Sequence, residues 1–127
     1  MSAQEAIATA AAPKPTGPYS QAVRVGSLLF VAGQIPIDPA TGQLVDDTIE
    51  AQTRQCLANL RAILEAAGGS LASVVRTGVF LSDLNDLVGM NDVYTSFFQT
   101  PLPARSTVEV SRLPRDVRIE IDAIAAI

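Results

Sequence analysis

The sequence contains no histidine and no tryptophan, and it has one cysteine, Cys56, and one lysine, Lys14. Without histidine, zinc sites with imidazole ligands, Ser-His-Asp triads and imidazole general bases are excluded. One thiol cannot form an internal disulfide, which is typical of proteins from a reducing compartment. Cys56 also lacks the imidazole base that activates catalytic cysteines, so we expect it to be a small core residue.

Positive charge and long hydrophobic runs are also scarce. The 127 residues carry a formal net charge of −4, and the arginines are scattered without a basic run or an interleaved aromatic ladder. Nucleic-acid and anionic-membrane binding both favour a basic field, so neither partner is expected. No stretch is long enough to span a bilayer, and the alanine-rich residues 6–12 lack the leader and apolar core of a secretory signal. We expect a soluble, cytoplasmic protein.

The length bounds the organisation of the chain. With 48% hydrophobic residues, 127 residues can bury one core but cannot form two domains. We expect a single domain over residues 1–127. Its N-terminal segment, residues 1–12, is expected to be partly flexible, with residues 1–4 loose and residues 5–9 forming a short edge strand before the proline-rich loop.

Apolar periodicity predicts five further strands and two helices. The strands are expected over residues 22–25, 28–32, 75–81, 103–110 and 117–123, the first two forming a hairpin through Gly26-Ser27. One helix is expected from Asp47, as N-cap with Glu50 as its capping-box partner, to Gly68-Gly69, and the other from Ser82-Asp83 to about Phe98. Two helices that each follow a strand predict an antiparallel or mixed sheet with both helices on one face.

The other face of this sheet has no predicted cover. Residues 28–32 are hydrophobic throughout, which is typical of a strand buried on both faces. Phe30, Phe80, Ile124 and one of Leu28 and Leu29 would add apolar groups that neither helix can reach. A contiguous apolar patch on a small acidic chain promotes association. We therefore expect a homo-oligomer in which sheets pack against one another.

The two final strands place an arginine and a glutamate on defined faces. Strict alternation points Arg105 away from Val108, and points Glu120 away from the apolar side chains of its own strand. A guanidinium can form two parallel hydrogen bonds with a carboxylate ligand, and a carboxylate can position a water molecule. The alternative is that Arg105 and Glu120 form an ordinary exposed ion pair, which is common and weak.

Three other positions are candidates for ligand contact, and each has a structural alternative. Tyr19 offers a phenol at the end of the proline-rich loop, or it is a half-buried core residue. Gly33 ends a strand and lets a ligand approach the main chain of Ala32 and Gly33, or it is only a bulge. Asn91 is the polar member of an apolar helix stripe, and it either bonds to nearby backbone or faces a ligand.

Several motifs occur in order between residue 13 and the C-terminus. They are Gly17-Pro-Tyr-Ser-Gln-Ala-Val23, Phe30-Val-Ala-Gly-Gln-Ile-Pro36, Gln52-Thr-Arg-Gln55, Met90-Asn-Asp-Val-Tyr94, Pro103-Ala-Arg-Ser-Thr-Val-Glu-Val110 and Leu113-Pro-Arg-Asp-Val-Arg-Ile-Glu-Ile-Asp-Ala-Ile-Ala. Together they resemble the RidA (reactive intermediate deaminase) family, also called YjgF-type or endoribonuclease L-PSP. The resemblance implies an α+β, chorismate-mutase-like subunit and a homotrimer with clefts between chains.

The resemblance also implies a reaction. It is the hydrolysis of 2-imino acids, such as 2-iminopropanoate and 2-iminobutanoate, to 2-oxo acids and ammonia. These reactive enamine/imine compounds are released by pyridoxal-phosphate-dependent dehydratases acting on serine and threonine. An imine carbon is already electrophilic, so the reaction requires no metal and no cofactor.

The implied site residues fall into two roles. Arg105 would bind the substrate carboxylate and Glu120 would hold the attacking water. The remaining residues would line the cleft, either with side chains or with main-chain groups that contact the developing tetrahedral centre. They are Tyr19, Asn91, Ala32, Gly33 and Thr107.

This chain departs from many relatives at two of these positions. Thr107 stands where relatives often have cysteine, and Ala32 stands where they often have serine. If only the backbone acts at both, activity is retained. Two other functions remain open, namely a non-catalytic protein that binds a 2-oxo acid or another small carboxylate in the same cleft, and an endoribonuclease or translation inhibitor. The acidic composition and the lack of histidine argue against the last.

Overall fold

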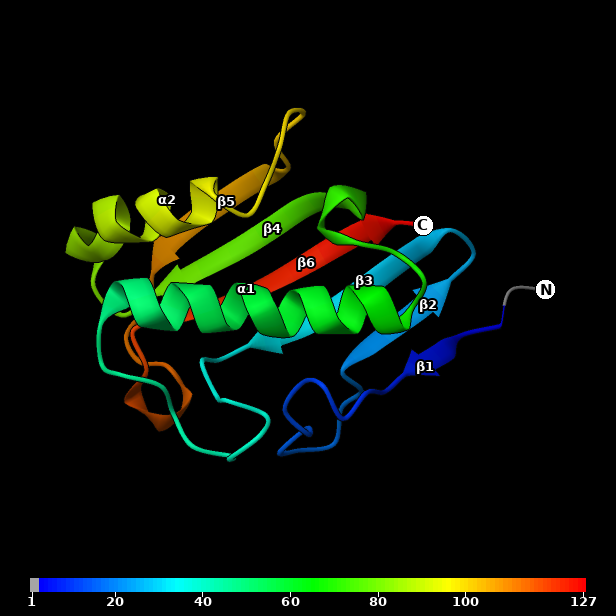
Figure 1. The fold of residues 1–127 in the computed structure, drawn as a ribbon, viewed down its shortest axis with the longest axis horizontal. Coiled ribbons are helices and arrows are strands. Elements are labelled where there is room, and N and C mark those ends of the chain that lie inside the picture. The colour runs from blue at the N-terminus through cyan, green and yellow to red at the C-terminus, as the bar shows by residue number, and fades with distance from the viewer. Residues whose placement is uncertain (1–2) are drawn as a thin grey trace.

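The computed structural model describes residues 3–127, so the predicted loose residues Met1 and Ser2 lie outside the described part of the chain. It contains a six-stranded sheet with the order β1-β2-β3-β6-β4-β5 (Figure 1). The strands are β1 Glu5–Ile7, β2 Ala22–Val25, β3 Leu28–Gln34, β4 Val74–Leu81, β5 Ala104–Glu109 and β6 Ile119–Ala126. Strands β4 and β5 pair in parallel and the other neighbours are antiparallel, so the predicted mixed sheet is confirmed.

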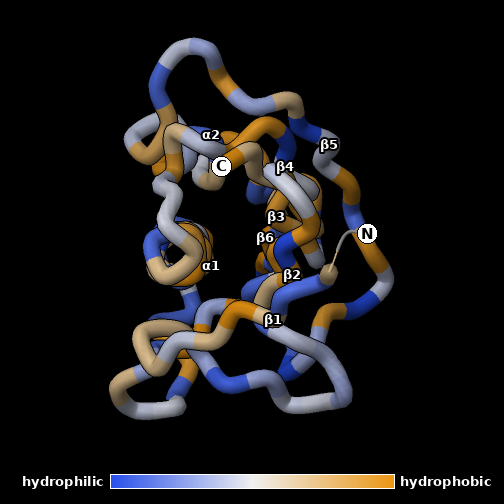
Figure 2. The backbone as a smooth tube through the Cα atoms, turned by 90° about the vertical axis from the view of Figure 1, so that its right-hand side faces the viewer, coloured by the Kyte–Doolittle hydropathy of each residue, from blue (hydrophilic) through white to orange (hydrophobic). Residues whose placement is uncertain are grey.

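Both helices lie on one face of the sheet (Figure 2). They are α1 Ile49–Ala66 and α2 Leu87–Thr95, and three short 3-10 helices complete the fold: η1 Leu71–Ser73, η2 Leu84–Asp86 and η3 Pro114–Asp116. Helix α1 packs on β6 and β3, and α2 lies beside α1 at the β4–β5 end of the sheet (Figure 1). This is the α+β architecture that the sequence predicted. Within residues 3–127, no helix is long and apolar enough to cross a membrane.

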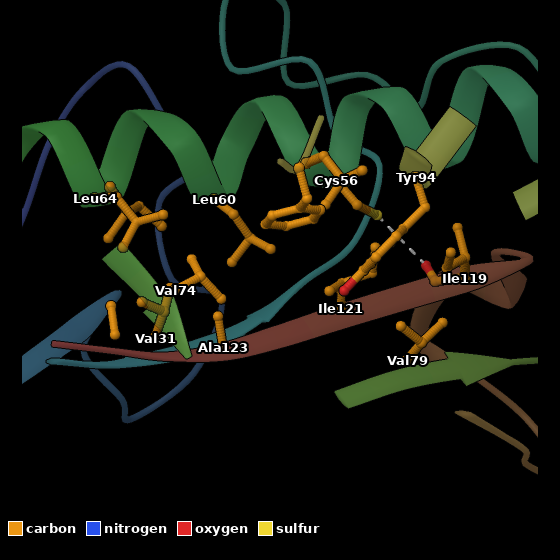
Figure 3. Close-up of a cluster of buried hydrophobic side chains, with 14 of the residues drawn as sticks. Val31, Cys56, Leu60, Leu64, Val74, Val79, Tyr94, Ile119, Ile121 and Ala123 are labelled. Carbon is orange, nitrogen blue, oxygen red and sulfur yellow. Dashed lines mark hydrogen bonds between the residues drawn. The ribbon is translucent and has the colours of Figure 1, made fainter. Parts of the chain in front are cut away.

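The core fills the space between α1 and the sheet (Figure 3). Leu60 and Leu64 of α1 and Ile119 and Ile121 of β6 are fully buried there. Burial of each such side chain contributes about 1.5–3 kcal/mol. Cys56 belongs to this cluster, with its Sγ 3.7 Å from the carbonyl oxygen of Ile119. Burial, and secondarily the nearby carboxylate of Glu120, raises the pKa of the Cys56 thiol, so the predicted core role of this cysteine is confirmed.

Three helix ends differ from the prediction. Helix α2 begins at Leu87 and not at Ser82-Asp83, because the turn that Asp83 caps is the separate 3-10 helix η2. The N-cap of α1 is Thr48, whose Oγ1 accepts a hydrogen bond from the Ala51 N–H at 3.1 Å. The helix therefore begins one residue later than predicted, and Asp47, which precedes the cap, pairs with Arg118 at 2.9 Å. Helix α2 ends at Thr95 rather than near Phe98, because the chain tightens there into i→i+3 hydrogen bonds, the first from the Ser96 N–H.

The face of the sheet opposite the helices is open. Along β3, Leu29 and Val31 are buried under α1, but Leu28 is 40% and Phe30 is 43% exposed. Within one chain this strand is buried on one face only, because the helices cover one face. Burial on its other face stays a prediction that requires cover by another subunit. Val108 of β5 is 45% exposed and adds to the same surface. We call this side of the sheet the open face.

A buried glutamine holds the N-terminal segment against the sheet. The Gln21 Nε2 donates to the carbonyl oxygens of Thr9 at 3.0 Å and Pro13 at 2.9 Å, and its Oε1 accepts from the Thr9 N–H at 2.7 Å. Gln21 is 4% exposed, so these bonds are shielded from water and stabilise the segment. The proline-rich loop that carries Tyr19 is fixed at both ends in this way.

Candidate functional site

A cavity of about 380 Å³ contains four of the seven residues that the sequence singled out. They are Tyr19, Ala32, Gly33 and Glu120. The rest of the wall is made by Thr16, Ile35 and Pro114. Strands β3 and β6 supply the floor, and the proline-rich loop and η3 supply the sides. We call this group the acid half.

Gly33 lets the Glu120 side chain lie flat on strand β3. A Cβ atom at position 33 would clash with the Glu120 carboxylate and would lie 2.8 Å from its Cδ. The β3–β6 register also shifts between Val31 and Gln34, so Gly33 sits in a bulge. Both interpretations of this glycine, a bulge and a point of close approach, therefore hold. The group that approaches it is a side chain of the same chain.

The Glu120 carboxyl is partly buried on the open face, and its pKa is raised. Its side chain faces away from the core, in register with Phe80 of β4, and it is partly buried. Loss of hydration, and secondarily the negative charge of Asp122, raises the pKa of the Glu120 carboxyl. A raised pKa brings a carboxylate closer to the range in which it exchanges protons efficiently near neutral pH. No group of three or more His, Cys, Asp or Glu side chains within residues 3–127 is arranged to hold a metal ion.

Tyr19 and Ala32 also line the acid half. Tyr19 is 50% exposed and its hydroxyl accepts a hydrogen bond from the Thr16 N–H at 3.4 Å, so it is not a core residue. The Ala32 N–H donates to the Gln21 carbonyl oxygen at 2.9 Å, and the Ala32 carbonyl accepts from the Gln34 side chain at 3.1 Å. The group that Ala32 still offers to a ligand is the second lone pair of that carbonyl.

Arg105 lies elsewhere, on the helix-covered face of the sheet. It is in register with Thr77 of β4, and its guanidinium carbon lies 4.8 Å from the centre of the Tyr94 ring of α2. Its Nη1 is 3.9 Å from the Met90 sulfur. The Tyr94 hydroxyl is fixed in turn by a 2.7 Å hydrogen bond with the Thr77 hydroxyl. Tyr94 thus forms a rigid aromatic platform for the guanidinium, worth about 0.5–1 kcal/mol at such an exposed site.

Thr107 lies on the same strand as Arg105, and Asn91 lies on the helix that Arg105 contacts. Thr107 is in register with the core residue Val79, so it shares the face of Arg105. It lies on an edge strand, where alternate main-chain groups point away from the sheet and are open to a ligand or another chain. Asn91 follows Met90 on α2, and its side chain makes no hydrogen bond within residues 3–127. Arg105, Thr107, Asn91 and their platform Tyr94 are called the arginine half.

The two halves cannot meet within one chain. Arg105 is on the helix-covered face of β5, Glu120 is on the open face of β6, and strand β4 lies between them. No ion pair joins the two residues, so the interpretation as an ordinary ion pair fails within the described chain. Tyr94 lies four residues after Met90, a spacing typical of the buried stripe of any helix, so no local pattern in the sequence indicated its contact with Arg105. A ligand that contacts both halves must lie between two chains.

Known proteins resemble this chain over nearly its whole length. The sequence profile described as Endoribonuclease L-PSP matches residues 9–127. A RutC family protein from Pyrococcus horikoshii is 59% identical over 96% of this chain and 97% of its own. The 2-iminobutanoate/2-iminopropanoate deaminase of Salmonella typhimurium is 52% identical over 94% of both chains. The crystal structure of E. coli TdcF with bound serine superposes with a TM-score of 0.93, at 44% identity, over 97% of this chain and 98% of that one.

Proposed function

The chain belongs to the RidA/YjgF family of endoribonuclease L-PSP proteins, and on that premise we propose that it is a 2-iminobutanoate/2-iminopropanoate deaminase. The observation that carries the proposal is the half-buried Glu120, with its raised pKa, in a cavity of about 380 Å³. A small 2-imino acid fits such a volume. The name of the Salmonella relative and the serine bound to TdcF both support a small amino-acid-like carboxylate as the ligand.

In the proposed reaction, Arg105 binds the substrate carboxylate with two charge-assisted hydrogen bonds. Glu120 orients a water molecule and takes one of its protons as the oxygen adds to the imine carbon. The substrate reacts as the protonated imine, so the addition gives a neutral carbinolamine. The proton on Glu120 then passes to the amino nitrogen and the C–N bond breaks. The carbinolamine hydroxyl gives its proton to Glu120 as it becomes the carbonyl of the 2-oxo acid, and ammonia takes that proton away as ammonium. Tyr19 and the main-chain groups of Ala32, Gly33 and Thr107 would orient the substrate and stabilise the tetrahedral centre.

We further propose that each site is formed by the arginine half of one protomer and the acid half of another, in a homotrimer. The placement of the halves on opposite faces supports this arrangement, because a head-to-tail ring brings one face of a protomer to a different face of its neighbour. The exposed Leu28, Phe30 and Val108 of the open face support burial against other protomers.

The test is a coupled assay. A dehydratase acting on L-serine or L-threonine generates the imine in situ, and formation of the 2-oxo acid is followed above the uncatalysed rate. Arg105→Ala is expected to lower kcat/KM at least about 100-fold, because two charge-assisted hydrogen bonds are lost. Glu120→Gln is expected to lower kcat. Arg54→Ala, which changes an exposed arginine of α1, is the matched control and is expected to keep full activity.

A different outcome would favour the binding-protein alternative. In that case the wild-type protein leaves the imine decay unchanged, and calorimetry detects pyruvate binding that Arg105→Ala abolishes. RNA cleavage by a nuclease-free preparation that persists in Arg105→Ala would instead favour the endoribonuclease alternative.

A further inference from the structure

A second cavity, of about 350 Å³, lies on the helix side of the molecule. It is formed by the C-terminal part of α1, by η1 and by the segment that joins α2 to β5. None of the seven candidate site residues lines it. Its apolar wall includes Leu71, Val74, Phe97 and Phe98. Two aromatic rings separate it from Arg105. The Phe98 ring packs on the Tyr94 ring with 4.7 Å between ring centres, and the Arg105 guanidinium lies over the Tyr94 ring.

Two opposite charges without ionic partners border this cavity. Arg61 and Glu65 both line it, and they are one turn apart on α1, a spacing at which such residues commonly pair. Here they do not pair. The Arg61 guanidinium instead lies 5.7 Å from the centre of the Phe97 ring, and within residues 3–127 neither side chain forms an ion pair. The cavity therefore offers a cation, an anion and an apolar wall together.

We propose that this cavity binds an α-amino acid with an apolar side chain. The ligand carboxylate pairs with Arg61, the ligand ammonium group pairs with Glu65, and the side chain packs against Leu71 and Phe98. Because each charged residue is exposed, either contact alone is weak, and recognition requires both charges and the apolar group in one molecule. The volume is in the range of ordinary small-molecule sites. This proposal does not depend on the deaminase activity.

Three probes that share one side chain test the charge pattern. Isothermal titration calorimetry of the intact protein is carried out with L-phenylalanine, with 3-phenylpropanoate, which lacks the ammonium group, and with 2-phenylethylamine, which lacks the carboxylate. L-phenylalanine is expected to bind at least about tenfold more tightly than either analogue. Arg61→Gln is expected to weaken L-phenylalanine binding about tenfold and to leave 2-phenylethylamine unchanged, whereas Glu65→Gln leaves 3-phenylpropanoate unchanged.

Two controls separate this site from the candidate active site. Arg54→Gln changes an exposed arginine of the same helix outside the cavity and is expected to bind L-phenylalanine like the wild type. Arg105→Ala is also expected to retain binding. Loss of binding in Arg105→Ala with normal binding in Arg61→Gln would overturn the proposal, because the amino acid would then occupy the deaminase site. Equal affinities for the three probes, or no binding up to about 10 mM, would overturn it as well.

Discussion

The acid half and the arginine half differ in how far one chain completes them. The acid half is a cavity that one chain forms by itself. The Gln21 hydrogen bonds fix its loop and a bulge lies in its β3 wall. Burial raises the pKa of its carboxyl. The arginine half is an exposed surface of an edge strand, where an aromatic ring orients a guanidinium that has no ionic partner in the described chain. In the proposed site, the carboxylate that would activate water is therefore half-buried by groups of its own chain, whereas the guanidinium that would bind the anion is exposed at the edge of the sheet.

The largest effect is expected when one half is removed from each of two protomers, which tests whether the two halves act together across chains. Arg105→Ala and Glu120→Gln proteins are each expected to be nearly inactive. When they are co-expressed with different tags and purified as mixed trimers, each ring contains one interface of the three that pairs an intact arginine half with an intact acid half. We expect about a third of the wild-type rate in the coupled imine assay, which is the largest effect among these predictions.

Mixed oligomers of Arg105→Ala with the Arg105→Ala/Glu120→Gln double variant serve as the control, since no interface then has an intact arginine. They are expected to stay inactive. If the first mixture also stays inactive although mixed oligomers form, the two halves do not work across chains.

The second prediction acts on the acid half alone. Gly33→Ala introduces a Cβ that displaces the Glu120 carboxylate, the flexible end of a side chain, and not the backbone. We therefore expect kcat to fall about 10- to 100-fold, as for other small misplacements of a catalytic group, with little change in Tm. Gly17→Ala is the matched control, because its Cβ would meet only the Tyr19 ring at an ordinary 3.4 Å. A large loss of Tm in Gly33→Ala would show that the backbone had moved instead.

Much of this fold could be predicted from local patterns, and the limits have identifiable causes. Alternation placed Arg105 and Glu120 on the correct faces of their own strands. That the two side chains lie on opposite faces of the sheet, and apart, depends on how β5 and β6 pair with β4 between them. That order is set by long-range pairing, which leaves no local signal. Asp47 and Thr48 are both favourable N-cap residues, and a local pattern does not show which of them starts the helix. The ion pair of Asp47 with Arg118, 71 residues along the chain, is equally invisible in such a pattern.

The site was predictable to a similar degree. The resemblance supplied the residue types, and the structure brings four of them into one cavity. What the pattern could not supply was the platform under Arg105. Tyr94 has the helical position of a core residue and is indeed buried. Its contact with the Arg105 guanidinium depends on strand β5, which comes beside α2 only when the chain has folded.

The third prediction acts on the arginine half and has a smaller effect. Tyr94→Leu removes the ring under Arg105 and is expected to raise KM about 2- to 5-fold, with kcat less affected. Tyr94→Phe keeps the ring but leaves the buried Thr77 hydroxyl without its partner, so it is expected to lower the free energy of unfolding by about 1–3 kcal/mol while KM stays near the wild-type value. Equal KM values for the two variants would show that the ring does not orient the guanidinium.

The smallest expected effect is a change in pH dependence within the acid half. The raised pKa of Glu120 means that the folded protein holds this proton to higher pH than the unfolded chain does. Activity that needs the carboxylate therefore falls as the pH drops through the raised pKa. The stability cost of the buried charge develops as the pH rises from the ordinary pKa of the unfolded chain to the raised pKa of the folded protein. Asp122→Asn removes the neighbouring negative charge but not the loss of hydration, so it lowers the Glu120 pKa without restoring its ordinary value.

The acidic limb of kcat/KM is therefore expected to move to lower pH in Asp122→Asn, while the rate on the plateau stays close to that of the wild type. The exposed Asp46→Asn variant controls for the loss of one negative charge and is expected to leave the limb in place. Rates are measured above the uncatalysed imine decay at each pH, because the imine itself titrates. A limb that stays in place in Asp122→Asn would mean that residue 122 does not act on the group that limits the rate. If the acidic limb of kcat/KM in Glu120→Gln stays at the wild-type pH, the group that limits the rate is not Glu120. The proposed mechanism would then require another general base.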